Sequence, residues 1–412
     1  MIEKTAEGKR SDRSSDIRLL IACALLYIFY IAAKNVYAVE IVEVMRRFDV
    51  PKSVASLASS AAFFTYGVTQ FFLAGLVPKM NIGRYIIVVV PVSGVLFSLT
   101  PFCTAIWQLV VLYAITGCLL AEVYPLCIYV VGKYLSDDLV SIGDRLLGVG
   151  LSVGFLLDYL GCSLLVKYYD WRPAFWIFSG LMIFGAVFFF VAFGISMKNA
   201  VSSDASPAGN QNSVSGSESG IRGHLGFIAF VCSLGFVSNF LYYAITGWVT
   251  AILCDVFEVS SSQSIFLTVF VPIVAMFGPL VEVHFCEKKS YWTVLIAFCL
   301  ASLIPMVVLS FLFKINLVLT LIPMVVYTAI MRGITTIVGI DLPLKTKDLI
   351  NAGTLGSIIN AVSCIGVSAG PPVMGAVIDV LGQRAFFIVT GALVILLTLL
   401  AFIGMKLFKS KR

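Results

Sequence analysis

Long apolar stretches alternate with short polar ones along almost the whole chain. Each apolar stretch has about 20 residues, the length that an α-helix needs to cross the hydrocarbon core of a bilayer. A transmembrane β-barrel would instead show short segments of alternating polarity. The pattern predicts an all-α membrane protein with twelve spanning helices, at 18–42, 54–78, 85–104, 107–131, 147–168, 173–196, 225–253, 261–283, 290–312, 316–340, 352–377 and 384–406.

A polar stretch rich in serine, glycine and asparagine separates the sixth predicted span from the seventh. It covers residues 198–223, and its composition is typical of a flexible linker. We therefore expect two bundles of six helices each, 18–197 and 224–408. A cytoplasmic segment, 1–17, precedes the first bundle, and a short tail, 409–412, follows the second.

The overall composition agrees with this pattern. Of the 412 residues, 60% are hydrophobic and 12% are charged, whereas soluble domains have about 45–50% apolar and about 25% charged residues. The net charge of +6 lies largely in the connections, where it attracts anionic lipid headgroups, so we expect a membrane-lipid partner and no nucleic acid. No phosphate-binding loop, metal motif or nucleophile–base pair is present, so we expect no enzymatic activity, no cofactor and no bound metal.

Lysine and arginine are concentrated at both ends of the chain and in every second connection. Because such residues accumulate on the cytoplasmic side of membrane proteins, this distribution predicts that both termini are cytoplasmic. The first apolar run is longer than the core of a cleavable signal peptide, so we expect it to be retained as a span. The expected protein is a monomer in the plasma (inner) membrane.

The two predicted halves resemble each other. The stretch DWRPAFWIFSG, which enters the sixth span, is similar to GQRAFFIVTG, which enters the twelfth. A glycine followed four residues later by a charged residue occurs after the second span, as Gly75 and Lys79, and after the eighth, as Gly278 and Glu282. Repeats of this size build the folds of secondary transporters, whose substrate site lies between the repeats near the middle of the membrane.

Three segments resemble motifs of the major facilitator superfamily. GLVPKMNIGR matches its Gly-x-x-x-Asp-Arg-x-Gly-Arg-type loop at Gly75 and Arg84, with Lys79 and Met80 at the positions of the acid and the arginine. GPLVEVHFCEKK has Glu282 at the position of the acid, and GVSAGPPVMGAVIDVLGQR is similar to the Gly-Pro-rich motif of antiporters. The resemblance implies the fold of this family, transport by alternating access, and loops that clamp the two halves. The loop residues implied are Gly75, Arg84, Gly278 and Glu282.

The resemblance also implies that spans 1, 4, 7 and 10 line a central cavity. The most unusual polar residues of the apolar runs fall in these four spans, and those of span 1 share one helical face. Two cations there, Lys34 and Arg332, suit an anionic substrate, and hydroxyl groups can donate to carboxylate or phosphate oxygens. The predicted substrate-binding residues are Lys34, Arg332, Tyr27, Tyr30, Tyr37, Asn239, Tyr242, Tyr243, Thr246, Thr328, Thr335 and Thr336.

Two acids within the apolar runs, Glu122 and Asp158, are candidates for proton coupling or gating together with Arg332. A charge at mid-depth costs about 2.5–3.5 kcal/mol, and pairing offsets part of this cost. Glu122 and Arg332 lie at nearly equivalent positions of the two repeats. We therefore expect them to face each other, either as a permanent strut or as a pair that opens when substrate or a proton binds. For Asp158 the alternatives are a hydrogen bond to a neighbouring helix or a pair with Lys34, and pairing of both acids would leave the cavity neutral.

Two short segments, AAKNVYAVEI and EVYPLC, resemble organophosphate–phosphate antiporters within the superfamily. The two phosphate-binding arginines of those proteins would fall at Ala33 and Tyr242, where this chain has no arginine. Their mechanism of phosphate-ester exchange is therefore not expected here. Lys34 and Arg332 remain as a different pair of anion-binding residues.

Three hypotheses follow for the function. The first is a secondary transporter that moves a small organic anion by proton symport or by exchange. The second is a proton-driven exporter of apolar or cationic compounds that uses Glu122 or Asp158. The third is a sensor that has the transporter scaffold but does not transport, although the sequence lacks the large soluble domain expected of it. Opposite effects of Lys34→Ala and Glu122→Gln would distinguish the first two hypotheses.

Overall fold

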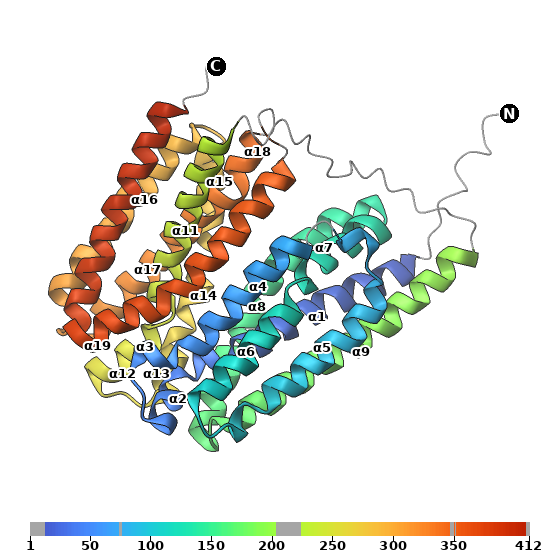
Figure 1. Ribbon diagram of the computed structural model, residues 1–412, viewed down its shortest axis with the longest axis horizontal. Helices are drawn as coiled ribbons and strands as arrows, with labels where there is room; N and C mark the ends of the chain where they lie inside the picture. The colour runs from blue at the N-terminus through green and yellow to red at the C-terminus, as the bar shows by residue number, and fades with distance from the viewer. Residues whose placement is uncertain (1–12, 74–75, 203–223, 347–349, 351, 409–412) are drawn as a thin grey trace.

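The computed structural model describes residues 13–73, 76–202, 224–346, 350 and 352–408. These residues form α-helices joined by short connections and no β-strand (Figure 1). Ten of the described helical segments are long and apolar enough to cross a membrane. The predicted all-α membrane architecture is therefore confirmed. The predicted N-terminal segment up to residue 12, the tail 409–412, most of the linker and Gly75 lie outside the described residues.

The helices of the first half of the chain begin and end close to the predicted spans. Their bounds are α1 Arg13–Val39, α2 Ile41–Phe48, α3 Lys52–Ala55, α4 Leu57–Leu73, α5 Ile82–Ser98, α6 Ile106–Leu120, α7 Val123–Tyr134, α8 Asp137–Tyr168 and α9 Arg172–Ser202. Two short 3₁₀ turns, η1 Val77–Lys79 and η2 Thr100–Phe102, precede and follow α5. The largest difference is in α8, which begins ten residues before the predicted span because the polar segment ahead of it is also helical.

The second half is divided into shorter helices. Their bounds are α11 Leu225–Thr246, α12 Val249–Phe257, α13 Ser261–Thr268, α14 Phe270–Ala275, α15 Phe277–Cys286, α16 Tyr291–Leu312, α17 Leu317–Thr336, the π-helical segment η3 Ile337–Asp341, α18 Leu342–Lys345 and α19 Ala352–Leu407.

Two features explain why ten candidate spans correspond to twelve predicted ones. The helix α4 has 17 residues, one fewer than the 18 required of a candidate span, so the second predicted span is not among the ten. The long element α19 contains both of the last two predicted spans, joined at Gly382. Its φ of 82° is a conformation that glycine adopts easily because it has no Cβ. Figure 1 shows two helical rods that meet near the label α19. The structure is thus consistent with twelve spans.

The helices predicted to line the cavity are interrupted. Glu40 separates α1 from α2, Glu122 separates α6 from α7, and Gly247 lies between α11 and α12. The fourth, α17, changes into the π-helical segment η3, a distortion that often occurs at functional sites. The break at Glu122 frees the carbonyl of Leu119, which accepts a hydrogen bond of 2.5 Å from the Tyr85 hydroxyl instead. Broken helices of this kind commonly form the substrate sites of transporters.

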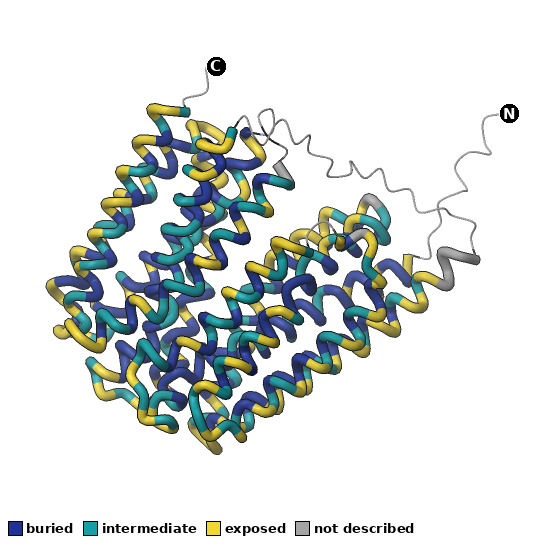
Figure 2. The backbone as a smooth tube through the Cα atoms, viewed as in Figure 1, coloured by how far each residue is buried: buried dark blue, intermediate teal, exposed yellow. Residues whose placement is uncertain are grey.

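The buried side chains form two large hydrophobic cores, one for each half of the chain, inside the two groups of helices (Figure 2). Where the halves meet, each core also contains a few residues from the other half of the chain. Ile41, Val42 and Ala55 of the first half pack into the second core, and Ile265 and Val269 of the second half pack into the first. This exchange joins the two halves at the end of the molecule where α2, α3, α12 and α13 gather (Figure 1).

Polar contacts reinforce the same end of the molecule. Asp379, in the bend of α19, accepts hydrogen bonds from the backbone N–H groups of Lys52 and Ser53 and from the Ser53 hydroxyl, at 3.1, 2.9 and 2.8 Å. The Lys52 ammonium forms an ion pair of 2.7 Å with Asp255 of α12. Asp379 thereby caps the short helix α3, which otherwise has four residues and little stability of its own. We call these four residues the inter-half lock.

Glycines permit the closest helix crossings. A Cβ at Gly117 of α6 would collide with the Ala62 carbonyl of α4. A Cβ at Gly366 of α19 would collide with the Phe236 carbonyl of α11. The Gly-Pro-rich segment therefore packs α19 closely against α11, as expected of small residues between membrane helices.

Candidate functional site

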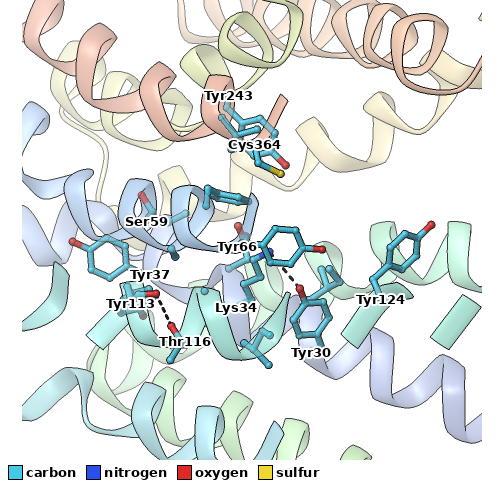
Figure 3. A pocket seen from close by; sticks show the side chains of 18 of the residues that line it. Tyr30, Lys34, Tyr37, Ser59, Tyr66, Tyr113, Thr116, Tyr124, Tyr243 and Cys364 are labelled. Atoms are coloured by element: carbon cyan, nitrogen blue, oxygen red, sulfur yellow. Dashed lines mark hydrogen bonds between the residues drawn. The ribbon is translucent and has the colours of Figure 1, made fainter. Parts of the chain in front are cut away.

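A cavity of about 240 Å³ lies between the two halves of the protein. Residues of α1, α4, α5, α6, α7 and α8 form its wall on one side, and residues of α11, α17 and α19 form the other. Most of the lining is aromatic or aliphatic. Figure 3 shows side chains from both halves turned toward this space, among them Lys34, Tyr66, Tyr243 and Cys364.

Lys34 of α1 is surrounded by aromatic rings in the cavity wall. Its Nζ lies 4.2 Å from the ring centre of Tyr66, 4.8 Å from that of Phe63 and 5.6 Å from that of Tyr30. It also donates a hydrogen bond of 3.3 Å to the Tyr30 hydroxyl (Figure 3). A cation over an aromatic ring is stabilised by about 0.5–1 kcal/mol at an exposed site and by about 2 kcal/mol when it is desolvated. The rings therefore stabilise an ammonium that forms no ion pair with any carboxylate of the described residues.

Arg332 of α17 lies on the opposite wall of the same cavity. Its guanidinium carbon is 5.9 Å from the ring centre of Tyr242. Within the described part of the chain, neither Arg332 nor Lys34 forms an ion pair with a carboxylate. Of the described residues that line the cavity, these two are the only charged ones. The described lining of the cavity thus has two positive charges, one from each half, and no acidic side chain.

The structure brings most of the predicted substrate-binding residues to this cavity. Those in its lining are Tyr27, Tyr30, Lys34, Tyr37, Asn239, Tyr243 and Arg332. Tyr242 and Thr246 line a smaller neighbouring space of about 70 Å³. The Tyr37 hydroxyl is already used, since it donates a hydrogen bond of 2.5 Å to the Ala55 carbonyl.

Three predicted threonines do not line the cavity. The hydroxyl of Thr328 donates to the Val325 carbonyl at 2.8 Å, and those of Thr335 and Thr336 donate to the Arg332 carbonyl at 2.8 and 3.0 Å. Hydroxyl groups in helices commonly bond to the preceding turn in this way. The hydroxyl donors of these threonines are therefore used within their own helix and are not available to an anionic solute.

Several lining residues were missed by the sequence prediction. Phe63 and Tyr66 of α4 contact the Lys34 ammonium, and Tyr113 and Tyr124 come from the two parts of the broken fourth span. Tyr124 lies two residues after Glu122 in the segment EVYP, and this proximity to an intramembrane charge was a usable signal. The others lie in uniformly apolar runs, where an aromatic residue that lines a cavity looks the same as one that faces lipid.

Glu122 does not line the cavity, and the expected pair with Arg332 is absent from this structure. Its side chain is fully buried, and neither carboxyl oxygen has a hydrogen-bond partner within the described chain. Its surroundings include Tyr85 of α5 and Tyr66 of α4. Both of these neighbours belong to the first half of the chain. The equivalent depth of the two charges was therefore not enough to place them face to face.

Asp158 of α8 lies directly behind the cavity wall. Its carboxylate accepts a hydrogen bond of 2.8 Å from the Asn35 side chain, which lines the cavity, and one of 3.2 Å from the Cys162 thiol. Of the alternatives from the sequence, the structure shows the hydrogen bond to a neighbouring helix and not the pair with Lys34. A second fully buried acid, Glu40, is close enough to interact electrostatically with Asp158. The sequence prediction missed Glu40 because it stands at the end of the first apolar run.

The predicted loop motif forms no charge pair between the halves in the described residues. The backbone N–H of Arg84 donates a hydrogen bond of 3.0 Å to the Asn81 side chain, which caps α5. Gly278 allows α15 to lie directly against the backbone of α17. Glu282 is fully buried in the second half, where its neighbours are Cys286 and Asp341.

The fold and the cavity define a helical membrane protein with a solute-sized space between two groups of helices. Comparison with known proteins gives the family. Residues 23–371 match the family model described as Major Facilitator Superfamily. A search of curated proteins found no match.

Several solved structures share the fold. A bacterial homologue of the human lysosomal transporter Spinster has a TM-score of 0.74 in an inward-facing and occupied conformation and 0.77 in an inward-facing and unoccupied one. Each is 13% identical, and the comparisons cover 94% and 95% of this chain and 96% and 97% of the relative. The nucleoside transporter NupG has a TM-score of 0.70 at 12% identity, with 96% of this chain and all of the other covered. At these identities the likeness shows the fold alone.

The chain belongs to the Major Facilitator Superfamily. It is accordingly an integral membrane protein and a secondary transporter of a small molecule, as the sequence predicted.

Proposed function

We propose that this protein transports a small organic anion by alternating access. The observation that supports the proposal is the charge of the cavity, whose only charged described lining residues are Lys34 and Arg332. Two desolvated cations without a carboxylate partner attract an anion strongly, because charges interact more strongly where water is excluded. The two cations come from opposite halves of the protein and line one cavity, so a bound anion is attracted by both halves.

The size and lining of the cavity suggest the rest of the solute. Its volume of about 240 Å³ is below the range of about 300–1,000 Å³ typical of drug-sized ligand sites. Tyr27, Tyr30, Tyr113, Tyr124 and Tyr243 offer flat faces for an apolar part or a ring. The proposed substrate therefore has a carboxylate or phosphate group and a compact apolar or cyclic body.

Asp158 is the proposed proton-coupling residue. Asp158 does not line the cavity itself, but its carboxylate accepts a hydrogen bond from Asn35, which does. A proton taken up there removes a negative charge close to the anion site without occupying that site. Proton symport is therefore the form of coupling that this arrangement favours over simple exchange.

The distribution of basic residues supports cytoplasmic termini. With that orientation, the inter-half lock lies on the outer side, and the structure corresponds to an inward-facing state. We further propose that the protein acts as a monomer in the plasma membrane. Substrate that enters from outside then requires the lock to open.

The proposal is tested by uptake into proteoliposomes that contain the purified full-length protein. Under an imposed inward proton gradient, we expect accumulation of compact radiolabelled monoanions and competition by other organic anions. Uptake of apolar cations that organic anions do not inhibit would contradict the proposal and support the exporter instead.

Removal of the Asp379 side chain is expected to open the outer side. Asp379→Ala deletes three hydrogen bonds to one carboxylate, and charged hydrogen bonds contribute about 1.5–3 kcal/mol each. Because Asp379 is exposed, solvent weakens these bonds. We therefore expect the equilibrium between the inward-facing and outward-open states to shift by about 1–2 kcal/mol toward the outward-open state. Spin labels at Tyr169 and Leu381, which are 80% and 63% exposed, would report a longer distance. They are placed in a background that lacks the exposed Cys118.

The matched control is Asp170→Ala. Asp170 is another acid near the same end, but its contacts are to its neighbours Trp171 and Arg172. The control should leave the distance distribution unchanged. An unchanged distribution in Asp379→Ala would show that the lock does not hold the outer side closed.

A further inference from the structure

Three potential metal ligands meet in the second half of the protein, away from the cavity. Glu282 and Cys286 are four residues apart on α15, so they share one face of that helix. Asp341 ends the π-helical segment η3. One ligand atom from each of the three lies within 4.8 Å of the other two. None of the three lines the cavity described above.

The two carboxylates of this cluster lack the partners that buried acids normally have. Glu282 is fully buried, and neither of its oxygens accepts a hydrogen bond within the described chain. Oδ2 of Asp341 is also buried and accepts no hydrogen bond from the described residues, so the polar neighbours of each acid are the other members of the cluster. Lys345 is close enough to act on Cys286 electrostatically, but it forms no ion pair with either acid among the described residues. Two such carboxylates repel each other unless a cation or a shared proton lies between them.

The surrounding backbone holds the three side chains together. One turn before Glu282, a Cβ at Gly278 would collide with the Ala329 carbonyl, so α15 lies directly against α17. The π-helical segment that continues α17 then places Asp341 beside the exposed end of α15. The cluster therefore rests on a close helix contact and not on mobile surface side chains.

We propose that Glu282, Cys286 and Asp341 form a binding site for a divalent transition-metal cation of the Zn²⁺ class. One thiolate and two carboxylates together outweigh the charge of the ion by one negative charge, and the Lys345 ammonium is close enough to act on Cys286 electrostatically. Zn²⁺ binds such ligands at about 2.0–2.3 Å, with a fourth position for water. Deprotonation of the thiol on binding releases one proton to solvent. The bound ion would tie α15 to the distorted end of the tenth span. This site is independent of the proposed substrate.

The sequence predicted no metal site. The prediction failed here because two of the ligands come from the end of the eighth span and the third comes from the end of the tenth. The distance between Cys286 and Asp341 in the sequence hides the cluster. Only the i, i+4 pair of Glu282 and Cys286 was visible, and that pair alone is common on helix surfaces.

The test uses full-length protein purified in detergent and treated with chelator, with Co²⁺ as a spectroscopic probe and Zn²⁺ as its competitor. We expect one Co²⁺ per chain, a thiolate-to-cobalt absorption band that Zn²⁺ removes, and a higher unfolding temperature with Zn²⁺. Cys286→Ser should lose the band. Glu282→Gln and Asp341→Asn should weaken binding by more than the roughly 10–100-fold that loss of a mere outer partner causes.

The controls separate this site from adventitious ones. Glu287→Gln changes the exposed acid that directly follows α15, Cys299→Ser changes another buried cysteine, and His284→Ala removes an exposed imidazole nearby. All three should bind the probe as the native protein does. Each variant is also tested with chelator, so that a loss of folding is seen separately from a loss of binding.

The proposal is overturned if the native protein shows neither the band nor the stabilisation. The same conclusion follows if His284→Ala abolishes binding while Cys286→Ser retains the band. In the first case, a proton shared between Glu282 and Asp341 would be the occupant instead of a metal. Anion transport can succeed or fail without affecting either result.

Discussion

Lys34→Ala is expected to reduce uptake of the anionic substrate to near background. The ammonium lies in the cavity, is held by three aromatic rings and has no carboxylate partner. A charged hydrogen bond contributes about 1.5–3 kcal/mol, so its loss alone weakens apparent affinity by about 10–150-fold. Arg332→Gln should have an effect of similar size. The measurement is initial-rate uptake into proteoliposomes over a range of substrate concentrations.

Lys314→Ala is the matched control for Lys34→Ala. Lys314 is an exposed lysine that also lies over an aromatic ring, that of Phe313, at 5.6 Å. Its removal should leave uptake unchanged. Lys34→Arg tests the ring cage, because the larger guanidinium does not fit the same three rings, and we expect intermediate uptake. Normal transport in Lys34→Ala together with its loss in Glu122→Gln would contradict the anion proposal and favour the exporter.

Asp158→Asn is expected to separate substrate movement from the proton gradient. The carboxylate is fully buried and accepts hydrogen bonds from Asn35 and Cys162. An asparagine has the same shape but cannot take up and release a proton near neutral pH. We expect gradient-driven accumulation to be lost, while exchange of labelled for unlabelled substrate continues at a rate within a few-fold of the native one.

Asp144→Asn provides the comparison for this variant. Asp144 is on the same helix but is exposed, and its replacement should leave both assays unchanged. Asn35→Ala should slow coupling without abolishing it, because Cys162 still donates to the carboxylate. Full accumulation in Asp158→Asn would exclude Asp158 as the proton site and would direct attention to Glu40, the second buried acid nearby.

Most spanning helices were predictable because a run of about 20 apolar residues has few alternatives in a membrane. α1, α9 and α16 begin and end close to the predicted bounds. The interruptions at Glu122, at Gly247 and in η3 were not predictable, because they depend on hydrogen bonds to other helices, such as that from Tyr85 to Leu119.

The location of the cations was also predictable from the sequence, since a charge is rare in an apolar run and usually lies inside the protein. The direction in which the Glu122 side chain points was not predictable. A break in the helix changes the face on which a side chain lies, and depth along the membrane carries no information about that face. The position of the threonines of α17 was not predictable for a different reason. A threonine hydroxyl can donate its hydrogen bond to a carbonyl of its own helix as easily as to a ligand.

The most direct test of the central claim is the charge selectivity of the cavity. Thermal unfolding of the purified protein is measured with three sets of compact ring compounds of equal size that have a carboxylate or phosphate, a neutral amide or an amine. Because only ligands that bind the folded state raise the unfolding temperature, we predict stabilisation by the anions alone. We also predict that it disappears when Lys34→Ala and Arg332→Gln are combined. Stabilisation by the amines, or equal stabilisation by the anions after both substitutions, would contradict the account.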